Sequence, residues 1–541
     1  MVTQANYPHD LSNFILTQYN RNSNIFFMST HSIQRQYLYL ELTGAEADGV
    51  ALQQKLPGFC QDRLAPAIER VLDRYAPVNG HILFERLEIA TVLLALDRLE
   101  QDLADAVAKA LEESLRKQLA ADRGSLAAGS DTMWRKTERE SIHDAFIHFL
   151  KHGTLPWSFR LPAGRTLEQE VLVSWRLPDR AWSGLHRTAG DLLVLLKSDT
   201  VRKRLVRQFS LEFLKSTLLL VSPSGTKVFD EILTLLQSVS LPSDGNKMLE
   251  RVLGETILTS IAMGVPLTKT DLLKRLHHAL AGTFTGQGAL AGVAAQLRTG
   301  AAVEESVVSS RQAGTIPAKP HLTAKRRSSR DIAAAGLLGN SEPTLSSGDS
   351  PETPAPIKSP GPSAQGAEQR YIFSPETGAG IYIENAGLAL LHPFLPLYFE
   401  ALAVASEDRL LQPERALCLL HYLTTGEAVA PEYELFLPKI LCNLNPETPV
   451  ESDVGLTGME LDESVALLEA VIRHWEALGN SSPDALRGTF LLRKGKISQR
   501  ENDWLLQVES QTCDILLGQL PWGISMIKLP WMKKTLWVEW R

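Results

Sequence analysis

The chain has 541 residues, of which 44% are hydrophobic and 22% are charged, and its formal net charge is -7 at pH 7. This length predicts about three or four folding units, and the mild acidity argues against nucleic acid as the main ligand. The four cysteines form no CxxC pair, and no stretch reaches the roughly 18 apolar residues of a membrane span. We therefore expect free thiols, no cofactor, no metal, no nucleic-acid partner and no membrane partner.

The N-terminal region is expected to combine a mobile arm with a small α+β domain. Residues 1–30 are rich in Asn, Gln and Ser without a sustained period, which is typical of an arm. Side chains alternate over residues 33–42, as a strand requires. We assign residues 31–160 to a domain in which strand and helix alternate twice under one helical layer.

Apolar spacing places the other elements of this domain. Steps of three and four residues predict helix within 45–75, and a second extended run follows at 81–90. The clearest amphipathic helix covers 95–121, and a further helix covers about 139–152.

The middle of the chain changes character near residue 299. Leu-rich segments predict a helical region over 161–298. No Phe, Trp, Tyr or Cys occurs between Gly300 and Arg370, so residues 299–370 are expected to be a disordered linker that cannot offset its ordering entropy. The basic run Lys325–Arg327 within it is more typical of a solvated charge run than of an anion site.

Residues 371–541 return to a core-forming composition. Six of the ten tryptophans lie between Trp475 and Trp540, and alternating residues from Leu536 predict a packed terminal strand. The fold class expected for the whole chain is α+β and predominantly α-helical, with a helical C-terminal domain that ends in strands.

A Leu-Pro-Trp tripeptide occurs three times. Proline fixes the chain direction and tryptophan supplies a large apolar anchor, so each copy predicts a sharp turn into a packed site. Core-anchored turns are favoured over direct partner contacts, which stay the alternative. The tripeptides are Leu155-Pro156-Trp157, Leu520-Pro521-Trp522 and Leu529-Pro530-Trp531.

A second motif begins at Asn385 and predicts a short buried helix that Pro393 and Pro396 kink or end, leaving His392 at the turn. A histidine there is more often a backbone cap than a catalyst. The candidate interaction or anchoring residues outside the tripeptides are therefore Asn385, His392, Pro393, Phe394, Pro396, Trp537 and Trp540.

Signatures of an enzyme are scarce. The sequence has no Walker loop, no GxGxxG after a strand and no nucleophile elbow. His143, His148 and His152 drift around a helix axis without a completing ligand, so solvent-facing or capping roles are favoured. A hydrolase that uses His392 or His421 with a carboxylate is the weakest reading, and we assign no catalytic, cofactor-binding or metal residues.

Several longer motifs occur at the two ends of the chain. They are IENAGLALLHPFLPLYFEAL, LLHYLTTG, YELFLPKILC, VIRHWEALGNSSPDALRGTFLLRKGK and DILLGQLPWGISMIKLPWMKKTLWVEW in the C-terminal region, and HSIQRQYLYLEL, LAPAIERVLDRYAPVNGHILFERLEI and HGTLPW in the N-terminal region. In this order they resemble the contractile injection system tape measure protein family. The resemblance covers both ends but not the linker. Ala90 and Thr91 depart from the acidic residue and glycine usual there, and Asn443 departs from a glycine, which affects local turns.

The resemblance implies a structural protein of phage-tail-like contractile particles, which sets inner-tube length while the tube polymerises from the baseplate. The implied partners are inner-tube subunits, baseplate or spike proteins of the same particle, and further copies of the chain in the tube lumen. The implied location is the bacterial cytoplasm during assembly and then the particle. An assembly chaperone, or an adaptor of the baseplate or spike that leaves the particle, is the alternative.

A protein that sets the length of a tube must also be able to span a long distance. Residues 300–370 would span up to roughly 220 Å at the polyproline rise of about 3.1 Å per residue. We therefore expect the C-terminal unit to anchor at one end of the particle, the N-terminal unit at the other, and the middle to supply span.

Overall fold

The computed structural model describes most of the chain on either side of the expected linker. The described residues are 14–17, 31–33, 36–40, 51–52, 55–56, 58–77, 80–84, 86–91, 94–95, 98–124, 133–176, 184–237, 243–283 and 380–540. The chain divides into two compact units, one of Met1–Ala302 with Glu376–Arg541 and one of Val303–Pro375. Every described residue belongs to the first unit, and the linker expected over 299–370 lies outside the described residues.

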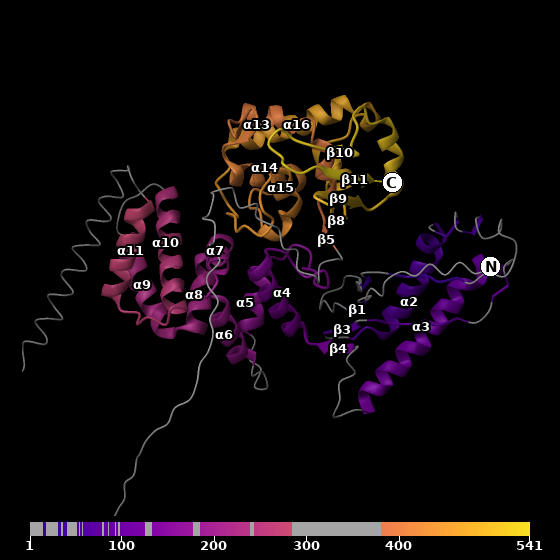
Figure 1. The fold of residues 1–541 in the computed structure, drawn as a ribbon, viewed down its shortest axis with the longest axis horizontal. Helices are drawn as coiled ribbons and strands as arrows, with labels where there is room; N and C mark the ends of the chain where they lie inside the picture. Colours follow the sequence, from indigo (N-terminus) through magenta and orange to yellow (C-terminus); the bar gives the residue numbers. More distant parts are fainter. Residues whose placement is uncertain are drawn as a thin grey trace, which may run out of the picture. The chain divides into compact units, whose positions relative to one another are not determined.

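Four short strands form an antiparallel sheet in the N-terminal region. They are β1 (Phe14–Thr17), β2 (Ser32–Ile33), β3 (His81–Phe84) and β4 (Met133–Lys136), in the order β2-β1-β3-β4. Ile82 and Phe84 of β3 are buried in a core shared with two helices, α2 (Ala65–Tyr75) and α3 (Leu99–Gly124), and a π-helical turn, η1 (Cys60–Leu64), leads into α2. Figure 1 shows α3 running alongside α2, as the predicted small α+β domain requires.

The sequence predictions fail at three places in this sheet. The arm expected over 1–30 contains β1, which pairs with both β2 and β3. Of the strand expected over 33–42, Ile33 lies in β2, whereas the described residues 36–40 form no strand. Leu40 packs against the core, but Tyr39 is 87% exposed. The strand expected over 81–90 ends at Phe84, because its neighbours β1 and β4 are each four residues long.

Eight helices of the described chain share one long core. They are α4 (Glu138–His152), α5 (Leu167–Arg176), α6 (Gly184–Leu195), α7 (Asp199–Gln208), α8 (Leu211–Val221), α9 (Pro223–Gln237), α10 (Ser243–Ala262) and α11 (Lys269–Thr283). Their core runs from Ile142 to Leu280 and includes the T-shaped contact of Phe146 with Phe213. The predicted helical middle is confirmed, and α4 shares its core rather than that of the N-terminal sheet.

The beginning of α4 shows why this helix forms where it does. Thr137 accepts a hydrogen bond from the Glu140 N–H, and the Glu140 carboxylate accepts one from the Thr137 N–H, which is a complete capping box. Gly153 ends the helix in the left-handed conformation (φ 74°), where its N–H donates to the Phe149 carbonyl.

The C-terminal domain joins short helices to a five-stranded sheet. The helical elements are η4 (Ala386–Leu391), α13 (Leu395–Ala401), α14 (Pro413–Thr425), η5 (Glu432–Glu434), α15 (Phe436–Leu441), α16 (Gly458–His474), η6 (Glu476–Leu478), α17 (Pro483–Leu486), η7 (Arg487–Leu491) and η8 (Thr512–Gln519). The strands are β5 (Ile381–Ile383), β8 (Gly495–Arg500), β9 (Asp503–Val508), β10 (Met526–Ile527) and β11 (Leu536–Trp540), and β6 (Ala405–Ser406) and β7 (Arg409–Leu410) form a separate pair.

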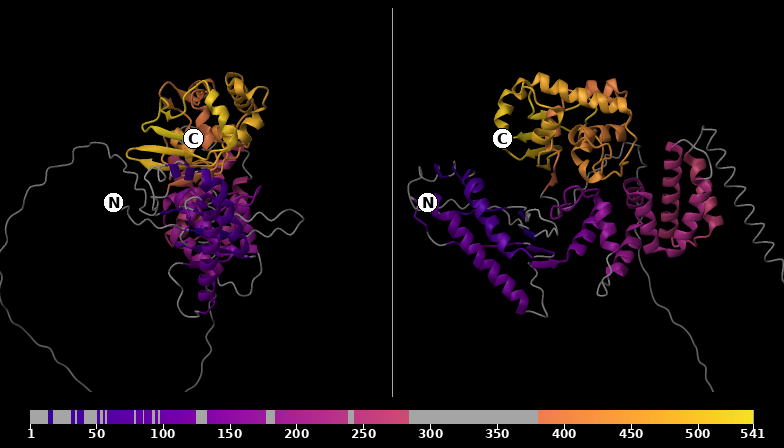
Figure 2. Two further views of the ribbon diagram at one scale, coloured as in Figure 1. Left: turned by 90° about the vertical axis from the view of Figure 1, so that its right-hand side faces the viewer. Right: turned by 180° about the vertical axis from the view of Figure 1, so that it is seen from behind.

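The sheet order is β10-β11-β9-β8-β5, with β11 parallel to β9 and the other pairs antiparallel. Figures 1 and 2 show the strands gathered at one side of this domain and α13, α14 and α16 at the other. The terminal strand expected from Leu536 onward is confirmed as β11.

Candidate interaction sites

The first Leu-Pro-Trp tripeptide follows the end of α4. Leu155 packs against the helical core, and the Phe159 N–H donates to the Pro156 carbonyl at 3.0 Å, which closes a turn. Pro156 and Trp157 are half-buried. This copy therefore redirects the chain from α4 toward α5.

The two later tripeptides attach their turns to other parts of the same domain. The Trp522 indole N–H donates to the Leu390 carbonyl at 3.0 Å, and the Trp531 indole N–H donates to the Leu441 carbonyl at 2.8 Å. Leu529 and Trp531 are buried, whereas Leu520 and Trp522 are half-buried. Pro521 and Pro530 are exposed, so the prolines are the parts of these turns that a partner can reach.

The motif from Asn385 folds as the 3₁₀ helix η4, which is entirely buried. Asn385 is 5% exposed, and its side-chain amide donates to the Glu434 carbonyl at 2.8 Å. Gly387 packs so closely against the Phe490 carbonyl that a Cβ atom would collide with it. At the end of η4, His392 Nδ1 lies 3.0 Å from the Ala389 carbonyl oxygen, and burial lowers the pKa of the ring.

The structure brings this motif together with the second tripeptide. Pro396 is the second residue of α13, where the first turn of a helix tolerates proline, so it does not end a helix as expected. Phe394 packs edge-on against Trp522 with ring centroids 5.1 Å apart, whereas Pro393 is exposed. Phe399 of α13 lies 5.7 Å from the ring of Trp531. Two aromatic pairs thus connect the segment 394–399 with the second and third tripeptides, more than 120 residues away in sequence.

The last two tryptophans differ in exposure. Trp537 is 36% exposed, donates to Asp503 at 3.2 Å and lies under the Arg500 guanidinium. Trp540 donates to Asp514 at 3.1 Å and lies under Arg493, which is fully buried. Trp537 is therefore the tryptophan among the candidates that presents the most surface to a partner.

The histidines considered for catalysis have structural surroundings. His421 is 1% exposed, burial lowers its pKa to about 4, and its Nδ1 lies 3.5 Å from a Glu434 carboxylate oxygen. The rings of His148 and His152 lie with centroids 4.6 Å apart and planes tilted by 44°, and burial lowers the pKa of His148 to about 4. Within the described part of the chain, no group of three or more His, Cys, Asp or Glu is arranged to hold a metal ion.

A buried ionic contact that the sequence analysis missed joins α7 to the C-terminal domain. Arg204 donates to the two carboxylate oxygens of Glu432 at 2.8 and 3.0 Å, and both side chains are fully buried. Lys439 donates to the same carboxylate at 2.7 Å. Burial lowers the pKa of Lys439, and Glu432 opposes that shift.

Backbone carbonyls complete this cluster. Arg204 also donates to the carbonyls of Leu150 and Glu447, both at 2.6 Å, and Lys439 donates to those of Pro446 and Thr448, both at 2.8 Å. Every cation thus has several acceptors, as a charge removed from water requires. We call the contact of Arg204, Arg207 and Gln208 with residues 432–453 the α7 joint.

Gly153 makes the close approach at the α7 joint possible. A Cβ atom at this position would collide with the Glu432 carboxylate and lie 3.0 Å from an Arg204 nitrogen, and its φ of 74° already favours glycine. Beside it, Phe149 of α4 packs edge-on against Tyr433 at 5.8 Å. The helix end at Gly153 is readable from sequence, but its contact with Glu432 is not.

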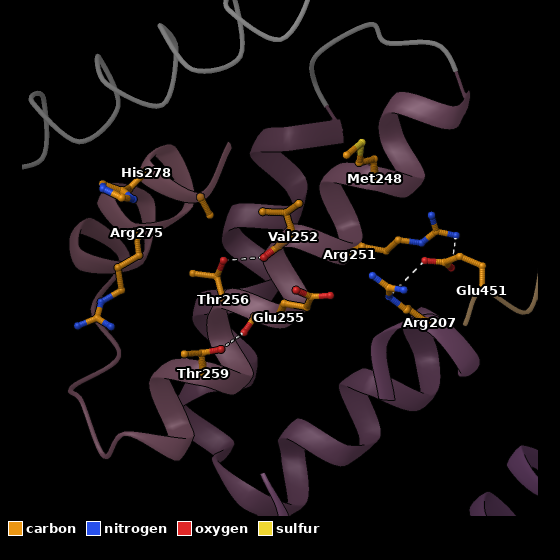
Figure 3. Close-up of a pocket in the computed structure, with 11 residues that line it drawn as sticks. Arg207, Met248, Arg251, Val252, Glu255, Thr256, Thr259, Arg275, His278 and Glu451 are labelled. Carbon is orange, nitrogen blue, oxygen red and sulfur yellow. Dashed lines mark hydrogen bonds and ion pairs between the residues drawn. The ribbon is translucent and has the colours of Figure 1, made fainter. Parts of the chain in front are cut away.

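Ion pairs surround the buried cluster. Glu451 pairs with Arg251 at 2.6 Å and with Arg207 at 3.6 Å, and Lys247 pairs with Asp453 at 2.9 Å. Figure 3 shows Glu451 pointing toward both arginines at the edge of a cavity of about 550 Å³ between α10 and α11. Burial raises the pKa of Glu451 to about 7, although Arg251 and Arg207 both lower it.

The family model of the contractile injection system tape measure protein matches residues 30–540. The chain belongs to this family. No match was found among curated proteins or among solved structures. As a structural tape measure protein, the chain assembles within a contractile injection particle together with tube components and lies inside that particle.

Membership in the tape measure family agrees with the geometry of the candidate residues. They hold turns, helix ends and sheet edges together rather than converging on a reactive centre. None of the helices that the structure describes is both long enough and apolar enough to cross a bilayer. The α7 joint is the feature of this tape measure protein that sequence reasoning missed, although Arg204 follows Val201 by three residues and so shares its apolar helix face.

Proposed function

We propose that this tape measure protein sets the inner-tube length while the tube polymerises from the baseplate, through direct contacts with inner-tube subunits and with baseplate or spike proteins. The observation that carries the proposal is the family match, which extends over both folded ends and the segment between them. The protein acts without catalysis, assembles in the bacterial cytoplasm, and acts alone or as several copies in the lumen.

Exposure selects which candidate residues a partner would touch. Of the sixteen, Pro393, Pro521, Pro530 and Trp537 are the exposed ones, and the others are buried or half-buried. We propose these four as partner contacts and the remainder as anchors, with Leu155, Pro156 and Trp157 holding the turn after α4 and the others holding the C-terminal domain in shape.

Deleting forty residues from within 303–375 tests the ruler directly. We expect particles shorter by at most about 120 Å, because each residue in a polyproline conformation adds about 3.1 Å. The measurement is the length distribution of purified particles by electron microscopy. The matched control replaces the same forty residues with an equally long Pro/Ser-rich sequence and should leave the length unchanged.

Two results would contradict this proposal. Unchanged particle length after the deletion would show that the linker does not contribute to the length that the protein sets. Absence of the chain from intact particles, measured by mass spectrometry, would point instead to an assembly chaperone or an adaptor that leaves before maturity.

A further inference from the structure

The α7 joint ties together two parts of the chain that lie on either side of the segment 303–375. Arg204 and Glu432 are 228 positions apart, yet both belong to one compact unit that excludes Val303–Pro375. The two ends of that segment therefore leave and re-enter the same unit. While the joint is closed, added linker residues cannot separate the helical region from the C-terminal domain.

The joint is polar, whereas the regions that it connects have apolar cores of their own. The core of α4–α11 runs from Ile142 to Leu280, and Tyr433 is the residue of the C-terminal domain that packs against it. On its side, the C-terminal domain buries its own set of apolar residues, from Ile383 to Val538. Separation at the joint would thus uncover charges and hydrogen-bonding groups rather than a large apolar face.

Hydrogen bonds between α7 and the backbone of the C-terminal domain fix how the two regions dock at the joint. The Gln208 side chain accepts from the Glu432 N–H and donates to the Val450 carbonyl, both at 2.7 Å. Arg207 donates to the Pro449 carbonyl at 3.3 Å, and its own carbonyl accepts from Ser452. These bonds fix the register of residues 449–452 against the end of α7.

Charge is divided across the α7 joint and the ion pairs that surround it, which include Lys247, Arg251 and Glu414. The helical side contributes Arg204, Arg207, Lys247 and Arg251, and the C-terminal side contributes Glu414, Glu432, Glu451 and Asp453 as their partners. Lys439 is the cation on the C-terminal side, and it shares Glu432. The outer pairs are partly exposed, since Lys247 and Asp453 are 50% and 40% exposed, so salt screens them.

We propose that the α7 joint is a releasable ionic lock, which holds the chain in a closed form until the joint opens. In the closed form the helical region and the C-terminal domain stay in contact, and residues 303–375 connect two points of the same unit. Opening lets residues 303–375 contribute to the distance between the two folded regions. This role in extension rests on the proposed ruler function, whereas the reversible association at the joint is independent of it.

A cleavable full-length chain tests the lock. A protease recognition sequence is inserted within 303–375, the folded protein is cut, and the association of the two parts is followed by size-exclusion chromatography and analytical ultracentrifugation. We expect the parts to stay together at low salt and to separate at about 1 M salt, where the screening length falls to about 3 Å. Separation at low salt would overturn the proposal.

Charge reversal on α10 sharpens the test. The variant Lys247→Glu/Arg251→Glu should weaken the association about tenfold or more, and Asp453→Lys on the opposite part should restore some of it. Lys215→Glu is the matched control, because Lys215 pairs with Asp230 inside the helical region and should leave the association unchanged. Equal association of the reversed variant and the unmodified protein would contradict the lock.

The uncut chain gives a second readout. In small-angle X-ray scattering the charge-reversed variant should show a larger radius of gyration than the Lys215→Glu control, with the same helix content by circular dichroism. An unchanged radius would mean that the joint does not open. The two proposals can be separated. Salt-dependent association with unchanged particle length after linker deletion would support the ionic lock and contradict the ruler function.

Discussion

Arg204, Glu432 and Lys439 form a cluster in which two cations share one carboxylate out of contact with water. Such a cluster adds little stability over well-packed apolar residues, because desolvation of the charges offsets most of their attraction. Loss of one member has a different effect, since its partners remain buried without a counter-charge. The cluster is therefore better suited to specifying one docking geometry than to strengthening it.

Replacement of Glu432 by glutamine measures this effect. Gln keeps the shape but leaves Arg204 and Lys439 without an anion, so we expect the free energy of unfolding to fall by about 3–5 kcal/mol. The matched control is Glu414→Gln, whose side chain is 41% exposed and pairs with Arg207 at 3.3 Å, and which should cost about 1 kcal/mol or less. Urea unfolding of both variants checks the difference, and equal losses would refute the buried-charge argument.

His421 makes acid stability a second test at this scale. Burial lowers the pKa of its ring to about 4 in the folded protein, against 6.5 as its ordinary value. Between pH 6.5 and pH 4 the His421 ring is protonated in the unfolded chain but stays neutral in the folded protein. Proton binding therefore favours the unfolded chain, and the free energy of unfolding decreases as the pH falls toward 4.

Replacement of His421 by asparagine should remove that loss. Relative to the variant, the unmodified protein should lose up to about 3 kcal/mol between pH 6.5 and pH 4. Free energies of unfolding across this range give the difference, with His278→Asn at an exposed position as the control. A difference that stays constant with pH would show that His421 does not titrate in this way.

At the scale of elements, the C-terminal domain depends on tryptophans that bond backbone across sequence. Trp531 fixes the turn before β11 to the end of α15, and Trp522 fixes the turn before β10 to η4. An unpaired buried carbonyl is costly, so these indoles supply a bond that no neighbouring backbone N–H provides.

Trp531→Phe should therefore destabilise the domain by about 1–3 kcal/mol, because it leaves the Leu441 carbonyl without its donor. Trp537→Phe loses a bond to Asp503 at a 36%-exposed position, where water replaces the donor, and is expected to cost less. Thermal unfolding of the two variants under identical conditions compares them. A larger loss of stability for Trp537→Phe than for Trp531→Phe would contradict the assignment of Trp531 as the stronger anchor.

Local signals explain which elements the sequence predicts well. The capping residues Thr137 and Glu140 and the glycine at 153 delimit α4, and apolar steps of three and four delimit α3. Strand β1 was missed because a four-residue strand depends on its neighbours β2 and β3 rather than on its own pattern.

The candidate site was predictable only in part for a similar reason. The residue type favours a packed ring with one bonded N–H, and the indoles of Trp522 and Trp531 each donate such a bond. Their acceptors, and the pairing of Arg204 with Glu432, depend on residues far away in sequence. Three arginines occur in α7, and local pattern does not say which of them finds a buried carboxylate.

At the scale of the whole molecule, the α7 joint connects residues that lie on either side of 303–375 in the sequence. Residues 1–302 and 376–541 form one compact unit, and 303–375 forms the other. The expectation that the middle simply separates two anchored ends therefore needs one more step, which is the opening of the α7 joint. Length setting and lock opening are then separate properties, and linker deletion and charge reversal address them one at a time.

The separation of 228 positions between Arg204 and Glu432 also sets an order in time. At typical rates of translation, about 5–20 residues per second, Arg204 leaves the ribosome roughly 10–50 s before Glu432 exists. For that interval the basic end of α7 has no carboxylate to receive it and is open to any acidic surface nearby. In a newly made chain the joint is therefore open at first, and it can close only after residues 432–453 have left the ribosome.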